Sequence, residues 1–221
     1  MEAAMKRSIA LVLGLCVMGN AHRAFAQDAA PGPGTVEATV MPGGAMFFTS
    51  RNGASGFGDY TLGGAVTYNI SRVIGLEGQV SGSIGISNRS LRLAGRVNCP
   101  VLPVGASACI LSGRAPNMLD YSGAVVVSMP THRWFIPYAT GGLGGLTMFE
   151  RPSLAINSTE TFLMGNVGGG LKWYAPNYRW GVRGDYRFTY VWSNHDAPAF
   201  FGTDDRYGHR VYGGVILNLT R

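Results

Sequence analysis

Hydroxyl, imidazole and carboxylate side chains gather in the C-terminal part of the sequence, where together they could perform hydrolytic chemistry. They are Ser193, His195, Asp196, Asp204, Asp205 and His209. Such residue types can supply a nucleophile, a general base and an orienting carboxylate. Their surroundings are a polar, loop-like string, and the histidines and aspartates have no recognised metal-ligand spacing. We therefore expect no catalytic residue, no metal and no cofactor, and the sequence predicts a protein that is not an enzyme.

Four arginines occur in residues 87–117, a stretch that contains no acidic residue. They are Arg89, Arg92, Arg96 and Arg114. Because a guanidinium binds phosphate in a bidentate manner, this cluster could grip a phosphorylated lipid or another anionic partner. A solvated basic loop explains the same residues equally well, and the sequence leaves both interpretations open.

The first 26 residues have the pattern of a secretory signal peptide. Lys6 and Arg7 supply a positive start, and Ile9–Met18 is apolar. Small residues at Ala24 and Ala26 then stand where a signal peptidase reads. The apolar run is too short to span a bilayer as a stop-transfer helix. We therefore predict export with cleavage before residue 27.

Two cysteines would remain after that cleavage, and they lie in the same Pro-, Gly- and Ser-rich stretch as the four arginines. An exported chain meets an oxidising compartment, which favours a disulfide between Cys99 and Cys109. A metal pair is the alternative, but no histidine or further cysteine lies near them in the sequence. The disulfide is the prediction that the sequence supports better.

Composition argues against nucleic acid as a partner. The 18 basic and 12 acidic residues give a formal net charge of +6, without a Lys- or Arg-dense helix or a finger motif. Glycine is frequent, with 33 residues, but no glycine cluster is followed by the Lys-Ser or Lys-Thr pair of a phosphate-binding loop. Glycines inside strands instead permit tight curvature and close packing.

Alternation of small or polar residues with Val, Tyr and other apolar ones dominates the rest of the chain. This period of two predicts β-strands, and helical periodicity is hard to find. We expect eight strands, at Val36–Phe48, Asp59–Ile70, Val73–Ile86, Met118–Pro130, Trp134–Phe149, Thr161–Ala175, Trp180–Trp192 and Tyr207–Leu219. They are long for a soluble protein, whose strands typically have roughly five or six residues. Their length suits a tilted crossing of a membrane.

The connections between these runs alternate in length. The tight ones are residues 71–72, 131–133 and 176–179, and the longer ones are residues 49–58, 87–117, 150–160 and 193–206. Short turns on one side and long loops on the other are typical of a transmembrane β-barrel whose short side faces the periplasm. The predicted fold is therefore all-β, an eight-stranded antiparallel up-and-down transmembrane β-barrel with short periplasmic turns and long extracellular loops.

Each predicted strand has one apolar face and one face of polar and small residues. Since a membrane barrel turns its apolar face to lipid, the charged residues should point into the lumen. The predicted lumen set is Glu37, Glu77, Lys172, Arg183, Asp185, Arg187 and Arg210. An unpaired charge in so confined a space is costly, so we expect interlocking ion pairs. A packed plug that carries nothing is favoured over a polar path, because eight strands leave little room inside.

Several segments resemble the eight-stranded outer-membrane β-barrel family of the OmpA/OmpX type. They are Pro137–Gly144, Asn166–Lys172, Trp180–Arg187 and His209–Leu219. The similarity is best over residues 134–221 and extends in strand layout over about 35–221. It implies a bacterial outer-membrane location, contact with outer-membrane lipid and lipopolysaccharide, and insertion by the barrel-assembly machinery. In one departure, the family usually closes on an aromatic residue, whereas this chain ends Leu219-Thr220-Arg221.

The resulting organisation is a signal peptide over residues 1–26, a flexible periplasmic segment over 27–34 and the barrel over 35–221. The resemblance implies little about activity, because family members serve as envelope-stabilising proteins, adhesins and host-interaction surfaces. We expect a structural or surface-interaction role, with loops that contact lipid, an extracellular ligand or a host surface.

Three other functions remain as alternatives: a small passive pore, a lipid A-modifying hydrolase and a soluble lipocalin-like barrel. Lipid A deacylases place His two residues before Ser on one face of a strand, and that order is absent around His195. A lipocalin would turn its charged face to solvent, which the strand lengths and the alternation of short and long connections argue against.

Overall fold

The computed structural model describes residues 31–50, 57–85, 88–93, 109–129, 134–152, 158–192 and 205–220. The predicted signal peptide lies outside these ranges. The strands are β1 (Val36–Ser50), β2 (Phe57–Asn69), β3 (Ile74–Gly85), β4 (Asn88–Leu93), β5 (Cys109–Arg114), β6 (Met118–Ser128), β7 (Phe135–Met148), β8 (Glu160–Tyr174), β9 (Trp180–Val191) and β10 (Arg206–Asn218). Within the described ranges, no helix has the length and apolar character needed to cross a membrane.

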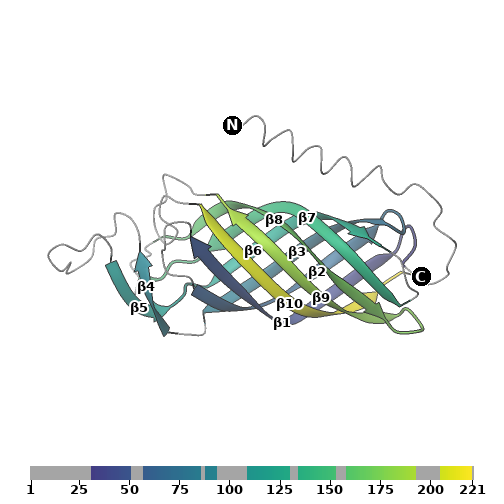
Figure 1. The fold of residues 1–221 in the computed structure, drawn as a ribbon, viewed down its shortest axis with the longest axis horizontal. Helices are drawn as coiled ribbons and strands as arrows, with labels where there is room; N and C mark the ends of the chain where they lie inside the picture. The colour runs from purple at the N-terminus through teal and green to yellow at the C-terminus, as the bar shows by residue number, and fades with distance from the viewer. Residues whose placement is uncertain are drawn as a thin grey trace, which may run out of the picture.

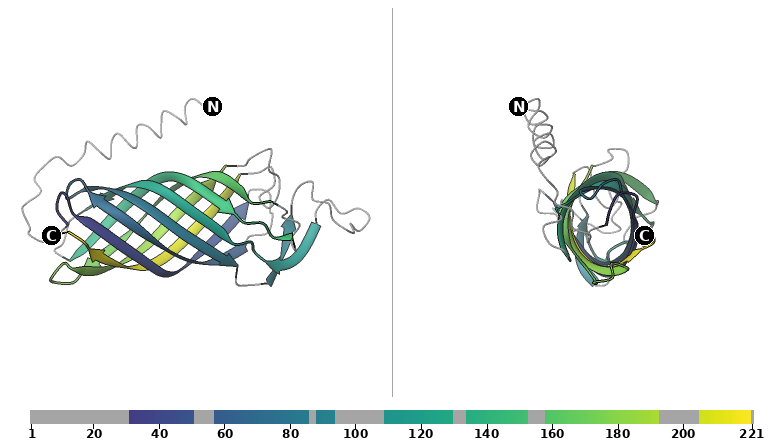
Figure 2. Two further views of the ribbon diagram at one scale, coloured as in Figure 1. Left: turned by 180° about the vertical axis from the view of Figure 1, so that it is seen from behind. Right: turned by 90° about the vertical axis from the view of Figure 1, so that its right-hand side faces the viewer.

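Eight of these strands form one closed antiparallel barrel in the order β1-β10-β9-β8-β7-β6-β3-β2. Figure 2 shows the ring seen along its axis. Each strand pairs with its neighbour in the chain, except that β3 pairs with β6 and β10 returns to pair with β1. The predicted eight-stranded up-and-down barrel is confirmed.

Alternating burial along each strand separates an inner wall from an outer wall. In β9, Arg183, Asp185 and Arg187 are buried, whereas Val182, Gly184 and Tyr186, which alternate with them, are exposed. One strand can present polar side chains to the lumen and apolar side chains to the outside, because successive side chains point to opposite faces of a sheet. The barrel therefore has a polar interior and an apolar exterior, the reverse of a soluble barrel.

Large apolar side chains cover the outer wall. Val80, Leu143 and Leu163 are 52%, 62% and 60% exposed, and they lie on three different strands. A monomer in water rarely exposes so continuous an apolar surface, but hydrocarbon solvates it well. Indole rings mark the turn end of the barrel, where Trp173 and Trp180 meet edge to face at 5.9 Å, and amphipathic rings of this kind favour a membrane–water boundary.

Residues 87–117, predicted as a single loop, contain a second small sheet. β4 and β5 pair with each other and not with the barrel, and Figure 1 shows them beyond one end of it. Each has six residues, which is too short to cross a membrane. The prediction was incomplete here because only long alternating runs were expected to be strands. β4 and β5 are short, and arginines interrupt their apolar pattern.

Pro42 interrupts the regular pairing of β1. The register shifts between Val40 and Gly43 on the side of β10, and between Met41 and Gly44 on the side of β2. Proline has no backbone N–H to give to a neighbouring strand, so an irregularity is expected where it occurs. The free Pro42 carbonyl accepts a hydrogen bond from the Tyr60 hydroxyl at 2.5 Å, which holds the distorted segment against β2.

Candidate functional site

Charged side chains fill the barrel in tiers, and the first tier lies at the end with the short turns. The carboxylate of Glu37 accepts a hydrogen bond and ion pair from Lys172 Nζ at 2.6 Å. It also accepts hydrogen bonds from Asn69 Nδ2 and the Tyr174 hydroxyl, both at 3.0 Å. Glu37 and Lys172 are 1% and 2% exposed. This tier fills the short-turn end of the lumen with one compensated charge pair.

Two acids and two arginines form a closed square in the middle tier. Glu77 accepts from Arg183 Nη1 at 2.6 Å and from Arg187 Nη2 at 2.5 Å. Asp185 accepts from Arg183 Nη2 at 2.6 Å and from Arg187 Nε at 3.1 Å. All four side chains are buried completely. Each guanidinium therefore bridges both carboxylates, an arrangement that the fork of donors on arginine makes possible.

Two tyrosines hold the square in place. The Tyr138 hydroxyl donates to Asp185 at 2.5 Å and accepts from Arg183 Nε at 3.1 Å. The ring of Tyr212 lies 5.8 Å from the guanidinium carbon of Arg187 and 5.6 Å from that of Arg210. Cations near an aromatic face are stabilised by the ring quadrupole. The two rings therefore fill space and also offset part of the energetic cost of burying the arginines.

A third charged tier lies nearer the opposite end. Arg210 Nη1 pairs with Asp120 at 2.5 Å and donates to Ser81 Oγ at 2.8 Å. The Ser81 hydroxyl in turn donates to the other carboxylate oxygen of Asp120. Because β6 and β10 are four places apart in the ring of eight, this pair spans the full width of the lumen.

Beyond the charged tiers, the lumen becomes mainly apolar towards the end opposite the short turns. The buried side chains there are Met46, Phe48, Met118, Leu146, Met148, Phe162, Met164 and Val191. Asp59 lies among them, 4% exposed, and neither of its carboxylate oxygens has a hydrogen-bond partner among the described residues. The lumen thus ends in a mainly apolar layer in which Asp59 is buried. Arg206, the cross-strand partner of Val191, is buried there as well.

All seven side chains of the predicted lumen set lie on the inner wall, and six of them belong to the first two tiers. Arg210 belongs to the third tier, where sequence reasoning missed its partner Asp120. Asp120 alternates in phase with Ser122 and Ala124, which was the signal that could have found it. Asp59 was also missed, because it is the first residue of the predicted strand Asp59–Ile70 and was not assigned to the inner face.

The residues that could do hydrolytic chemistry are not brought together in the described structure. His209 Nδ1 lies 2.9 Å from the Tyr186 hydroxyl on the outer wall, and Asp205 accepts a hydrogen bond from Tyr190. The other members, Ser193, His195, Asp196 and Asp204, lie outside the described residues. Among the described residues, no group of three His, Cys, Asp or Glu side chains could hold a metal ion.

Three of the four clustered arginines lie on the small sheet. Arg89 and Arg92 are in β4 and Arg114 ends β5, whereas Arg96 lies outside the described residues. Cys109 begins β5, where its backbone pairs with that of Leu93. Cys99 also lies outside the described residues, so the Cys99–Cys109 disulfide stays a prediction.

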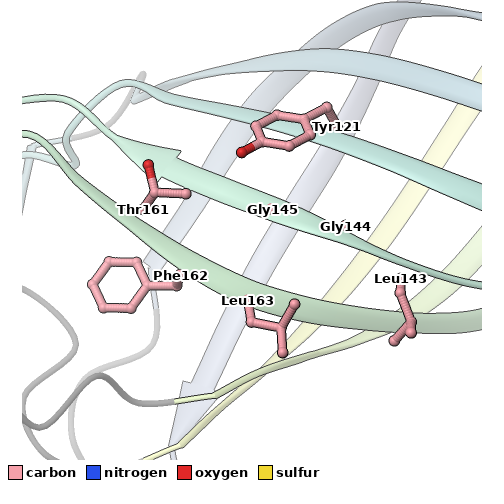
Figure 3. A pocket seen from close by; sticks show the side chains of 7 residues that line it. All are labelled: Tyr121, Leu143, Gly144, Gly145, Thr161, Phe162 and Leu163. Atoms are coloured by element: carbon pink, nitrogen blue, oxygen red, sulfur yellow. The ribbon is translucent and has the colours of Figure 1, made fainter.

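A shallow depression lies on the outer wall over β6, β7 and β8 (Figure 3). Its lining is Tyr121, Leu143, Gly144, Gly145, Thr161, Phe162 and Leu163. Gly145 has no room for a side chain, since a Cβ there would collide with the ring of Tyr121. The depression contains no charged group and opens on the apolar face of the barrel, so it offers an uneven surface to lipid rather than a reactive site.

Residues 9–212 match the family described as outer membrane protein beta-barrel domain. No curated protein shows significant sequence similarity to the chain. Among solved structures, neisserial surface protein A is similar over 84% of this chain and 96% of its own, with 11% identity and a TM-score of 0.55. The N-terminal β-barrel domain of Pseudomonas aeruginosa OprF matches over 86% and 100%, with 14% identity and a TM-score of 0.46. The likeness to neisserial surface protein A concerns the fold.

Proposed function

Since the chain belongs to the outer membrane protein beta-barrel domain family and is located in the bacterial outer membrane, we propose that it is a closed, non-conducting scaffold that holds its long loops at the cell surface. The observation that carries this proposal is the set of three charged tiers across the lumen, at Glu37, Glu77 and Asp120. In this proposal, residues 1–26 are cleaved on export and the barrel-assembly machinery inserts the chain.

Passage of a solute would require these tiers to open. Each ion pair that separates in a confined, low-dielectric space leaves two charges without compensation, which is strongly unfavourable. The large apolar side chains buried at the extracellular end, such as Phe48, Leu146 and Phe162, further narrow the path for a hydrated solute. A structural plug therefore fits the interior better than a passive pore.

Conductance measurements test the closed lumen. We expect the refolded chain, reconstituted in planar lipid bilayers, to give no stepwise current at moderate voltage, because ion pairs cross the lumen in every tier. Bilayers that receive detergent alone provide the baseline. Regular current steps that scale with the amount of protein would support the small passive pore instead.

We further propose that the chain is not an enzyme. The described histidine of the hydrolytic set, His209, contacts aromatic residues, with the Phe188 ring 5.4 Å away and the Tyr186 hydroxyl at its Nδ1. A catalytic histidine of a triad faces a nucleophile with one ring nitrogen and a carboxylate with the other. These two neighbours of His209 do not include a carboxylate. Within each of the three tiers of the lumen, acidic and basic side chains compensate one another.

The surface role that we propose is binding of anionic lipid by the four clustered arginines. β4 and β5 place Arg89, Arg92 and Arg114 on one hairpin beyond the barrel end that lies opposite the short turns. In an outer membrane this end adjoins the phosphate groups of lipopolysaccharide, with which arginine forms bidentate, charge-assisted hydrogen bonds. An extracellular ligand or host surface of similar charge would be bound by the same chemistry.

Replacement of all four arginines by alanine tests this role. We expect Arg89→Ala/Arg92→Ala/Arg96→Ala/Arg114→Ala to weaken binding of purified lipopolysaccharide at least tenfold, measured by surface plasmon resonance with the chain in nanodiscs. The matched control is Arg72→Ala/Arg179→Ala, which removes basic side chains from the short turns and should change binding little. Equal binding by the quadruple variant and the wild type would overturn the proposal.

A further inference from the structure

The methionines of the barrel are concentrated at one level of the lumen. Met46, Met118, Met148 and Met164 are each 2% exposed or less and belong to the apolar layer at the extracellular end, whereas Met129 is 55% exposed. We propose that Met46, Met118 and Met148, together with Asp59, form a binding site for a soft monovalent cation of the Cu(I) or Ag(I) type.

The pairing of the strands brings the three thioethers together. Met118 of β6 is the direct partner of Met148 on β7, and Ser83 of β3 is the direct partner of Met118. The Ser83 hydroxyl donates a hydrogen bond to Met46 Sδ at 3.7 Å, so the Met46 side chain extends from β1 towards these strands. β1 and β7 are four places apart in the ring of eight, so Met46 and Met148 extend from opposite walls of the lumen.

A negative charge without a partner lies beside them. Asp59 is the cross-strand neighbour of Met46, and neither of its oxygens has a hydrogen-bond partner among the described residues. By contrast, Glu37, Glu77 and Asp120 each form an ion pair with lysine or arginine. A buried carboxylate needs a compensating charge or a proton. A cation held between Asp59 and the thioethers would supply that charge.

The donor set selects the class of ion. Thioether sulfur is a soft ligand that favours Cu(I) over hard cations. Calcium requires about six to eight oxygen ligands, whereas the cross-strand neighbours of Met46 and Met118 supply side-chain oxygen only at Asp59 and Ser83. Structural zinc sites are built mainly from cysteine and histidine. The carboxylate of Asp59, beside Met46, carries one negative charge, which a monovalent ion would balance.

Titration with Ag⁺ tests the site, because Ag⁺ has the same preference for sulfur and needs no reducing agent. The chain is refolded in detergent with Cys16→Ser, Cys99→Ser and Cys109→Ser, since free thiolates would bind Ag⁺ themselves. Isothermal titration calorimetry should give one Ag⁺ per chain, with sulfur ligands in X-ray absorption. We expect Met46→Leu/Met118→Leu/Met148→Leu to abolish binding and Asp59→Asn to weaken it at least tenfold.

Two methionines outside the site serve as matched controls. Met129→Leu changes an exposed thioether, and Met41→Leu changes a buried one that packs against Ala65 and Tyr212 deeper in the lumen. Both should bind Ag⁺ as the cysteine-free parent does. Heat-dependent gel mobility checks that each variant is folded, and the single variant Met118→Leu replaces the triple one if the latter does not fold. A parent that binds no Ag⁺, or folded site variants that bind it unchanged, would show that the layer is an apolar plug filled by flexible side chains.

Discussion

Glu77→Gln is expected to lower the free energy of unfolding by about 3–5 kcal/mol, the cost of breaking a buried ion pair by removing one partner. Glu77 accepts from both Arg183 and Arg187, and all three side chains are completely buried. The substitution would leave two guanidiniums to share the single charge of Asp185. The measurement is urea unfolding of the chain in lipid vesicles, followed by tryptophan fluorescence.

Two further variants separate the lost pairing from a general effect of substitution. Glu150→Gln removes an exposed carboxylate just beyond β7 and should change the unfolding free energy by less than about 0.5 kcal/mol. Glu77→Gln/Arg187→Gln removes one charge of each sign and should recover part of the loss, as expected for coupled residues. If Glu77→Gln were no more harmful than Glu150→Gln, the square of charges would contribute nothing to stability.

Val80→Arg on the outer wall should make folding into a bilayer less favourable by about 2–4 kcal/mol. Val80 lies in the middle of β3 and is 52% exposed, so in an outer membrane it faces hydrocarbon. An arginine at the midplane of a membrane barrel costs about 2–4 kcal/mol, and the cost falls to about 0–1 kcal/mol near the interface. The measurement is the free energy of folding into lipid vesicles.

Ile70→Arg provides the matched comparison, because Ile70 is 50% exposed but stands at the short turn after β2. It should fold almost as well as the wild type, since its charge can reach water and headgroups. A barrel surrounded by water would tolerate Val80→Arg as readily as Ile70→Arg, and that result would favour the lipocalin-like alternative.

The strands could be predicted to within a few residues because a membrane barrel gives every strand two different solvents. Lipid requires one face to be apolar, and the narrow lumen requires the other to be small or polar, so a period of two is imposed along the whole strand. β9 has this pattern throughout. The small sheet of β4 and β5 was missed because neither condition applies beyond the barrel end, and short strands there need no long alternation.

The inner face could be predicted from sequence, but the partners across the lumen could not. Arg187 and Glu77 are 110 residues apart, and Arg210 and Asp120 are 90 residues apart. Their meeting depends on how far each strand is shifted against the next, because the sum of these shifts decides which levels of opposite strands coincide. The alternation of polar and apolar residues shows which side chains point into the lumen, but it does not give the shift between neighbouring strands. The three charged tiers can therefore be recognised only in the closed barrel.

Closure of the ring joins the first and last strands, and this has a consequence for folding. The Val36 N–H donates to Thr220 Oγ1 across 184 residues of sequence, and β1 pairs with β10 along most of its length. Until β10 arrives, β1 keeps an open edge of unpaired N–H and C=O groups, which hydrocarbon cannot satisfy and which can recruit other chains. Partial barrels are therefore poor intermediates, and the slow search for a distant strand becomes the step during which the chain needs protection.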